Sequence, residues 1–218
     1  MNAMDLAILW DMDGTLLDTR ACHYMTWRDV LLKHGYSLSE AVFDEHFGRN
    51  NASILPVYLG FEPAPELAKE LISEKEALYR EAAPAKVHLF PGVESWLQTA
   101  QSLGIRQAIA SSGSLENIRM MADVFGLSPY FNETISGAEL PAKPEPDVFL
   151  VAAKALGVPP EKCLVVEDSI PGINAAINAG MKSIALTSTN PASRLSEADE
   201  IVNDFTAPLQ GYLDKLFS

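Results

Sequence analysis

The sequence is poor in cysteine, and it has no apolar run long enough to cross a membrane. Its two cysteines, Cys22 and Cys163, lie far apart and form no CxxC pair. This usage is typical of a reducing compartment and argues against a structural zinc site, so we interpret both as ordinary buried thiols. The first residues, "MNAMDLAILWDMDG", lack the basic start of a secretory signal, and no stretch approaches the roughly 20 apolar residues of a membrane span. We therefore expect a cytoplasmic protein without a membrane partner.

Basic residues are also scarce. The chain has 29 acidic and 16 basic residues, which gives a formal net charge of −13 at pH 7. Because nucleic-acid binding depends on neutralising phosphates with Lys and Arg, a surface this acidic repels DNA, RNA and anionic lipid. A small anionic ligand can still bind where a local cation or a metal ion overrides the overall field.

The fold class follows from what the sequence does contain. It has 218 residues, 48% of them hydrophobic, which suits one large domain or a domain with an insertion. Short apolar runs of strand length alternate with amphipathic segments that end at glycines, a pattern typical of a parallel sheet with helical crossovers. The sequence therefore predicts an α/β fold with a doubly wound, Rossmann-like parallel sheet. The predicted strands are "LAILW", "RQAIASS", "ETISG", "CLVVED" and "SIALTS".

A long helical segment interrupts this alternation after the first predicted strand. The segments "CHYMTWRDVLLKHG" and "ELAKELISEKEALYREAA" are amphipathic, and "FGRNNAS" reads as a turn between helices. We expect residues 18–87 to form an α-helical cap domain, inserted into a catalytic core made of residues 1–17 and 88–218. The C-terminal "APLQGYLDKLFS" is predicted to be a closing helix.

Polar side chains gather where the predicted strands end. In open α/β sheets, ligands bind at the carboxyl ends of the strands, so these side chains are expected to share one crevice. So many carboxylates would repel one another without a cation, and oxygen ligands without His or Cys favour a hard ion such as Mg²⁺. A magnesium ion beside a lysine forms a site for phosphate. The residues concerned are Asp11, Asp13, Ser111, Ser112, Lys143, Glu167 and Asp168.

These segments also resemble a known family. "DMDGTLLDT", "ASS", "AKPEP" and "VVEDS", in this order, are similar to the four motifs of the haloacid dehalogenase superfamily, and the insertion lies where that family places a helical cap. The nearest subgroup comprises small-molecule phosphatases and β-phosphoglucomutases. The resemblance implies that Asp11 is the nucleophile that becomes an aspartyl-phosphate and that Asp13 is the general acid and base. Asp13 argues against the dehalogenases, which generally lack an acid there.

The resemblance also implies the remaining roles. Ser111, with Ser112 as the alternative one position on, binds phosphoryl oxygens, and Lys143 balances the charge of Asp11 and of the phosphate. Asp168, with or without Glu167, completes a Mg²⁺ shell that includes Asp11 and the carbonyl oxygen of Asp13.

Three polar residues of the expected cap have two interpretations. His23 lies one helical turn before Trp27, and Lys75 lies one turn before Tyr79, a spacing that often means ordinary packing plus a surface charge. However, His23, Arg49 and Lys75 also resemble positions at which β-phosphoglucomutases hold the sugar phosphate. A loop arginine such as Arg49 can bind a phosphate through two hydrogen bonds.

Taken together, the motifs predict a Mg²⁺-dependent phosphatase that acts on a small phosphorylated metabolite such as a sugar phosphate, as a monomer or weak dimer. A phosphosugar mutase of the β-phosphoglucomutase type uses the same core and is the alternative. A non-enzymatic regulatory protein on this fold is a third hypothesis, disfavoured because every catalytic position is filled. A calcium loop of the EF-hand type is excluded, since the required Gly and Glu positions do not match.

Overall fold

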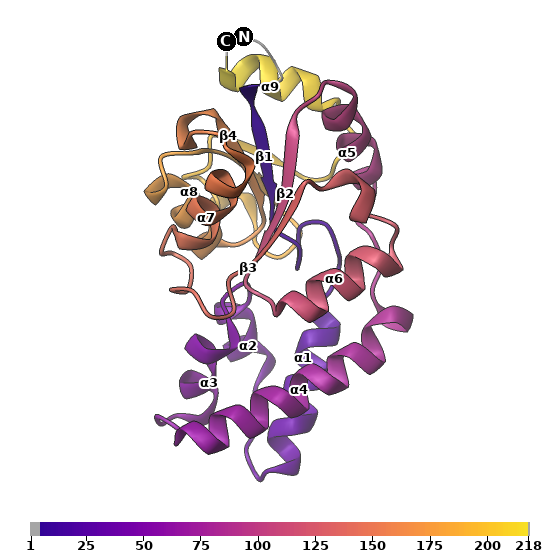
Figure 1. The fold of residues 1–218 in the computed structure, drawn as a ribbon. Helices are drawn as coiled ribbons and strands as arrows, with labels where there is room; N and C mark the ends of the chain where they lie inside the picture. The colour runs from indigo at the N-terminus through magenta and orange to yellow at the C-terminus, as the bar shows by residue number, and fades with distance from the viewer. Residues whose placement is uncertain (1–4, 218) are drawn as a thin grey trace.

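The computed structural model describes residues 5–217, so residues 1–4 and Ser218, which the prediction assigns to the core, lie outside the described residues. These residues form a parallel sheet of six strands in the order β3-β2-β1-β4-β5-β6, which confirms the predicted fold class. The sheet stands upright in Figure 1, with helices on both sides. The strands are β1 Ala7–Trp10, β2 Arg106–Ser111, β3 Glu133–Ser136, β4 Cys163–Glu167, β5 Lys182–Leu186 and β6 Glu200–Val202.

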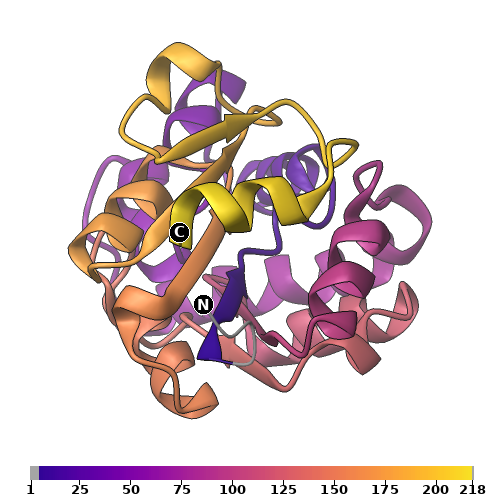
Figure 2. The same ribbon diagram turned by 90° about the horizontal axis from the view of Figure 1, so that it is seen from above.

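Strand β1 lies in the middle of the sheet, and its side chains alternate between two cores. Ile8 and Trp10 pack with residues of α5, α6 and α9, whereas Ala7 and Leu9 pack with residues of α7 and α8. Seen from above, α7 and α8 lie on the opposite side of the sheet from α5 (Figure 2). A strand that is buried on both faces reads as a continuous apolar run, as "AILW" does. These helices are α5 Val93–Ser102, α6 Leu115–Val124, α7 Asp147–Leu156, α8 Ile170–Asn178 and α9 Leu209–Phe217.

The segment between β1 and α5 is helical and lies beyond the carboxyl ends of the strands (Figure 1). It has its own hydrophobic core, which includes Trp27, Phe43, Leu55 and Leu71. A turn at residues 47–50 separates two of its helices, as the "FGRNNAS" pattern predicts. We call this helical segment the cap; its helices are α1 Arg20–Lys33, α2 Glu40–His46, α3 Asn51–Leu59 and α4 Pro65–Lys86.

One strand was not predicted. β6 has only three residues and pairs with β5 at the edge of the sheet, where Glu200 and Ile201 are not buried. An edge strand this short lacks the apolar run on which the other predictions depended. Among residues 5–217, no helix is both long and apolar enough to cross a membrane.

Asn50 fixes the position of the cap over the core. Its side-chain oxygen accepts a hydrogen bond from the backbone N–H of Ser53 and so caps α3. Its amide nitrogen donates to the carbonyl oxygens of Gly137 and Leu140, both at 3.1 Å, in the loop that follows β3. Because Asn50 is buried, these carbonyl groups have little access to water as a substitute partner.

We therefore expect Asn50→Ala to lower the free energy of unfolding by about 2–3 kcal/mol, since it removes a helix cap and two hydrogen bonds from the cap to the core. Urea denaturation measures this change. Ser39→Ala is the matched control, because exposed Ser39 caps α2 through one hydrogen bond and makes no such contact with the core. Equal destabilisation by the two substitutions would show that Asn50 acts only as a helix cap.

Candidate active site

The strand register brings the predicted site residues to one edge of the sheet. Trp10 pairs with Ile109 of β2 and with Val166 of β4, so the residues that follow these three strand positions are neighbours. Asp11 continues β1, and its backbone N–H donates to the carbonyl oxygen of Val166 at 3.0 Å. The parallel pairing alone therefore places Asp11 between Glu167 and Ala110, the residue that precedes Ser111.

A buried lysine joins two of the carboxylates. The ammonium group of Lys143, which precedes α7, lies 2.6 Å from Oδ1 of Asp11 and 2.6 Å from Oε1 of Glu167. All three side chains are almost completely buried. Burial alone would lower the pKa of Lys143, but the charges of Asp11 and Glu167 and their hydrogen bonds outweigh it and raise the pKa. Lys143 therefore remains a fixed positive charge beside Asp11.

Glu167 is fully engaged by hydrogen bonds. While Oε1 contacts Lys143, Oε2 accepts from the backbone N–H of Asp168 at 2.8 Å, the backbone N–H of Ser169 at 2.7 Å and the hydroxyl of Ser169 at 2.9 Å. Its carboxylate also packs against Gly172 in the first turn of α8, where it occupies the space that a Cβ would need. The structure thus places Glu167, predicted as a metal ligand, where it orients Lys143 and the loop after β4.

Asp168 contacts the turn that follows β1, at Gly14 and Thr15. Its carboxylate accepts hydrogen bonds from the hydroxyls of Thr15, at 2.8 Å, and Thr189. Gly14 packs directly on this carboxylate with φ +90°, and a Cβ there would collide with it. Burial and the charge of Glu167 raise the pKa of Asp168 to about 8.

The buried charges at this edge do not balance. The carboxylates of Asp11, Glu167 and Asp168 face the single positive charge of Lys143. Burial, opposed by Lys143, raises the pKa of Asp11 well above its ordinary range. An excess of buried carboxylate with only oxygen donors fits a hard divalent cation such as Mg²⁺.

Within residues 5–217, no three His, Cys, Asp or Glu side chains by themselves form a metal cluster. A ligand set of Asp11, Asp168 and the backbone carbonyl of Asp13 is consistent with that finding.

Asp13 lies between the core and the cap. Oδ2 of Asp13 accepts from the hydroxyl of Ser111 at 3.4 Å, and Oδ1 lies 3.1 Å from Nε2 of His23 on α1. Burial would raise the pKa of Asp13, but the charge and the hydrogen bond of His23, with a contribution from Lys75, outweigh it and lower the pKa. The carboxylate of Asp13 is therefore ionised when the pocket holds no anion.

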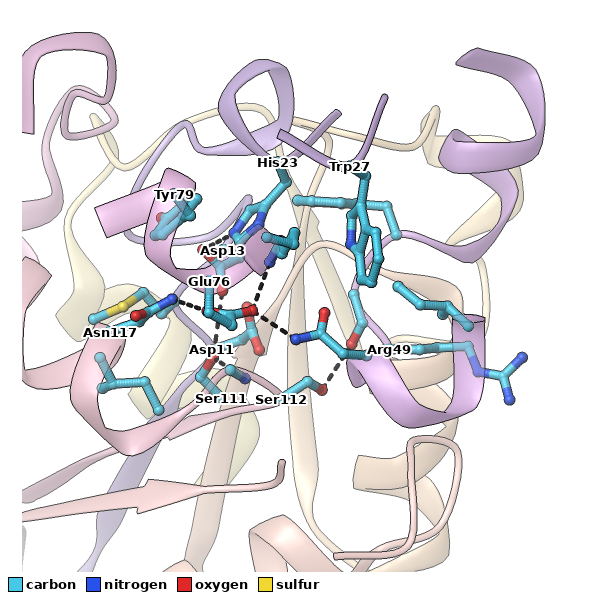
Figure 3. Close-up of a pocket in the computed structure, with 18 of the residues that line it drawn as sticks. Asp11, Asp13, His23, Trp27, Arg49, Glu76, Tyr79, Ser111, Ser112 and Asn117 are labelled. Atoms are coloured by element: carbon cyan, nitrogen blue, oxygen red, sulfur yellow. Dashed lines mark hydrogen bonds and ion pairs between the residues drawn. The ribbon is translucent and has the colours of Figure 1, made fainter. Parts of the chain in front are cut away.

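His23 and Lys75 both line a pocket above Asp11 and Asp13 (Figure 3). The ring of His23 stacks on Tyr79 with centroids 4.1 Å apart. Lys75 is only 2% exposed, so it is not a surface charge; its ammonium lies over the rings of Trp27 and Tyr79. The space between atoms in this pocket, including its opening to solvent, is about 650 Å³.

Two of the predicted site residues, Ser112 and Arg49, form no hydrogen bond with Asp11 or Asp13. Ser112 donates to the carbonyl oxygen of Gly48 in the cap at 2.8 Å, so its hydroxyl joins core to cap. Arg49 lines the pocket, but Figure 3 shows its guanidinium group directed away from Asp11 and Asp13. Its buried Nε has no hydrogen-bond partner among the described residues.

Sequence reasoning missed three polar residues of the pocket wall, namely Asn51, Glu76 and Asn117. They come from α3, α4 and α6, and the first and last of these amides both donate to Glu76. None lies in a motif. Glu76 is one of many charged residues on a long amphipathic helix, and its position next to Lys75 was the only available signal.

Comparisons with known proteins agree with this geometry. The profile of the haloacid dehalogenase-like hydrolases matches residues 6–180. Hexitol phosphatase A of Escherichia coli (strain K12) is 30% identical, with 89% of each chain covered. A phosphorylated carbohydrates phosphatase of Thermotoga maritima is also 30% identical, over 89% of this chain and 92% of that protein. The crystal structure of β-phosphoglucomutase from Clostridium difficile superposes with a TM-score of 0.85 at 26% identity and covers 96% of each chain.

The charge excess leads to a prediction for Asp168→Asn. Removing one uncompensated buried carboxylate should raise the melting temperature in EDTA by about 3 °C or more. The same variant should lose the further stabilisation that wild type gains from millimolar Mg²⁺, as thermal denaturation with and without the ion would show.

Asp199→Asn provides the control. Lys182 and Ser183 bind the carboxylate of Asp199, so this change should lower stability and leave the response to Mg²⁺ intact. A Mg²⁺-induced shift in Asp168→Asn as large as that of wild type would remove Asp168 from the ligand set.

Proposed function

Because the chain belongs to the haloacid dehalogenase-like hydrolase family, we propose that it is a Mg²⁺-dependent phosphatase that cleaves a small phosphate monoester, such as a sugar phosphate. The reaction proceeds through an aspartyl-phosphate on Asp11. One observation carries the proposal: Asp11 is held by Lys143 and lies beside Asp13 at the floor of a pocket under the cap. The phosphatases that act on hexitol and carbohydrate phosphates support the substrate class.

The first step is attack by Asp11 on phosphorus, which breaks the bond to the leaving oxygen. Lys143 engages Oδ1 of Asp11, and no hydrogen bond among the described residues involves Oδ2, so we assign the attack to Oδ2. Lys143 would balance charge on the phosphoryl oxygens, and the hydroxyl of Ser111 would donate a hydrogen bond to one of them. Mg²⁺, when bound by Asp11, Asp168 and the carbonyl of Asp13, would neutralise further charge on the phosphoryl group.

Asp13 moves the protons. It gives a proton to the leaving oxygen and later takes one from the water that attacks the aspartyl-phosphate, which frees Asp11 and releases phosphate. Its lowered pKa suits the second role. For the first, an incoming anionic phosphate raises the pKa of Asp13 again and so helps it to carry a proton. His23, bonded to Asp13 and stacked on Tyr79, orients the carboxylate toward the pocket.

A phosphosugar mutase is the second candidate function. It is favoured by the superposition on β-phosphoglucomutase and by the polar side chains that the cap places over Asp13. A mutase needs the same aspartyl-phosphate, but it must admit a sugar hydroxyl to it instead of water.

Asp11→Asn should lower the rate of phosphate release from p-nitrophenyl phosphate by at least roughly 10³-fold, because the amide cannot act as the nucleophile. Asp18→Asn is the control on the same loop; Asp18 pairs with His88 and should be dispensable. In wild type, EDTA should abolish release and Mg²⁺ should restore it. Unchanged turnover by Asp11→Asn would exclude Asp11 as the nucleophile.

The two candidate functions differ in their products. With β-glucose 1-phosphate and a trace of the 1,6-bisphosphate, a phosphatase yields inorganic phosphate in proportion to the substrate consumed. We expect this outcome, which a colorimetric phosphate assay and an enzymatic assay for glucose 6-phosphate distinguish. Glucose 6-phosphate that accumulates without inorganic phosphate would establish the mutase instead.

A further inference from the structure

The cap side of the pocket carries a buried carboxylate that the reaction does not use. Glu76 lies on α4, is 7% exposed and lines the pocket (Figure 3). Oε1 accepts hydrogen bonds from the ammonium of Lys75 at 2.7 Å and from the amide of Asn51 at 2.6 Å. Oε2 accepts from the amide of Asn117 on α6. Donors from the cap and the core thus hold this side chain in one position.

Glu76 is a fixed negative charge. Burial would raise its pKa, but the charge of Lys75 and the hydrogen bonds from Lys75 and Asn51 outweigh it and lower the pKa. In turn, the ammonium of Lys75 is bound to a carboxylate and is not free to bind a second anion. Of the other basic side chains that line the pocket in residues 5–217, His23 faces Asp13, and Arg49 directs its guanidinium group away from Asp11 and Asp13.

The part of the pocket wall that surrounds Glu76 is therefore polar without an uncompensated positive charge. Lys75 and Glu76 neutralise each other, and Asn51 and Asn117 contribute amide groups. Carboxylate and amide groups can bind sugar hydroxyls. A second phosphate or a carboxylate on the substrate would find no free cation on this part of the wall, because Glu76 already pairs with Lys75.

We propose that Glu76 is a specificity-determining residue that reserves the pocket for monophosphates with an uncharged, hydroxyl-bearing leaving group. Substrates with a second phosphate or a carboxylate on the leaving group are rejected. This inference rests on the proposed phosphatase function and narrows its substrate class.

The test compares substrates that differ only in charge. Sorbitol 6-phosphate ends in CH₂OH where 6-phosphogluconate has a carboxylate, and glycerol 3-phosphate and 3-phosphoglycerate form a shorter pair. Wild type should favour the uncharged member of a pair by at least roughly tenfold in kcat/KM. In Glu76→Gln this preference should shrink roughly tenfold, mainly through a lower KM for the charged substrate, because Lys75 becomes free to bind it.

Three variants separate charge from structure. Glu74→Gln, two residues earlier on α4, is the matched control: Glu74 binds Lys33 and His34 and does not line the pocket, so the preference should stay. Glu76→Asp keeps the charge and should keep the preference. The double variant Lys75→Met/Glu76→Gln removes both charges and should discriminate like wild type against the charged substrate.

Two results would overturn the inference. The first is wild type that hydrolyses both members of each pair equally well, a measurement that does not depend on any variant folding. The second is folded Glu76→Gln with an unchanged preference. Failure of the phosphatase proposal has a different signature, namely wild type that releases no phosphate from any of the four compounds or from p-nitrophenyl phosphate.

Discussion

The ion pairs of Lys143 with Asp11 and Glu167 are the constraint on which the site depends. Asp11 and Glu167 lie at the carboxyl ends of the adjacent strands β1 and β4, and Lys143 lies between them. Removing Lys143 would leave both buried carboxylates without their ion-pair partner. The helix N-terminus and hydroxyl that hold Glu167 keep the lysine in place, and the lysine keeps Asp11 in place. The nucleophile is thereby positioned by the folding of the sheet itself.

The fold could be predicted well from the sequence, and the reason is physical. Strands buried on both faces read as apolar runs, and "AILW", "RQAIAS" and "CLVVE" all became strands that end beside the site. The edge strand Glu200–Val202 carries no such run and was missed. Helix α6 begins after a capping serine, Ser114, whose hydroxyl accepts from the backbone N–H of Asn117.

The site residues at the strand ends were predictable from the sequence, and those of the cap were not. Residues at strand ends could be placed together because parallel register fixes them, so Asp11, Ser111 and Glu167 were expected to converge. For the cap, the sequence does not reveal which polar residues face the pocket. Whether a polar residue of α4 faces solvent, as Glu74 does, or the pocket, as Glu76 does, depends on how the helix packs on α1 and α6. Two residues of the same type, two positions apart, therefore have different surroundings that a single sequence does not reveal.

The hydrogen bond from Ser112 to the carbonyl oxygen of Gly48 has a consequence for the motion of the molecule. Ser111 is the last residue of β2, and Ser112 is the first residue of the loop that follows. Gly48 belongs to the turn between α2 and α3. Any movement of the turn at residues 47–50 away from the core would break this hydrogen bond, one peptide unit from Ser111. The position of the cap and the conformation of the loop after β2 are therefore coupled.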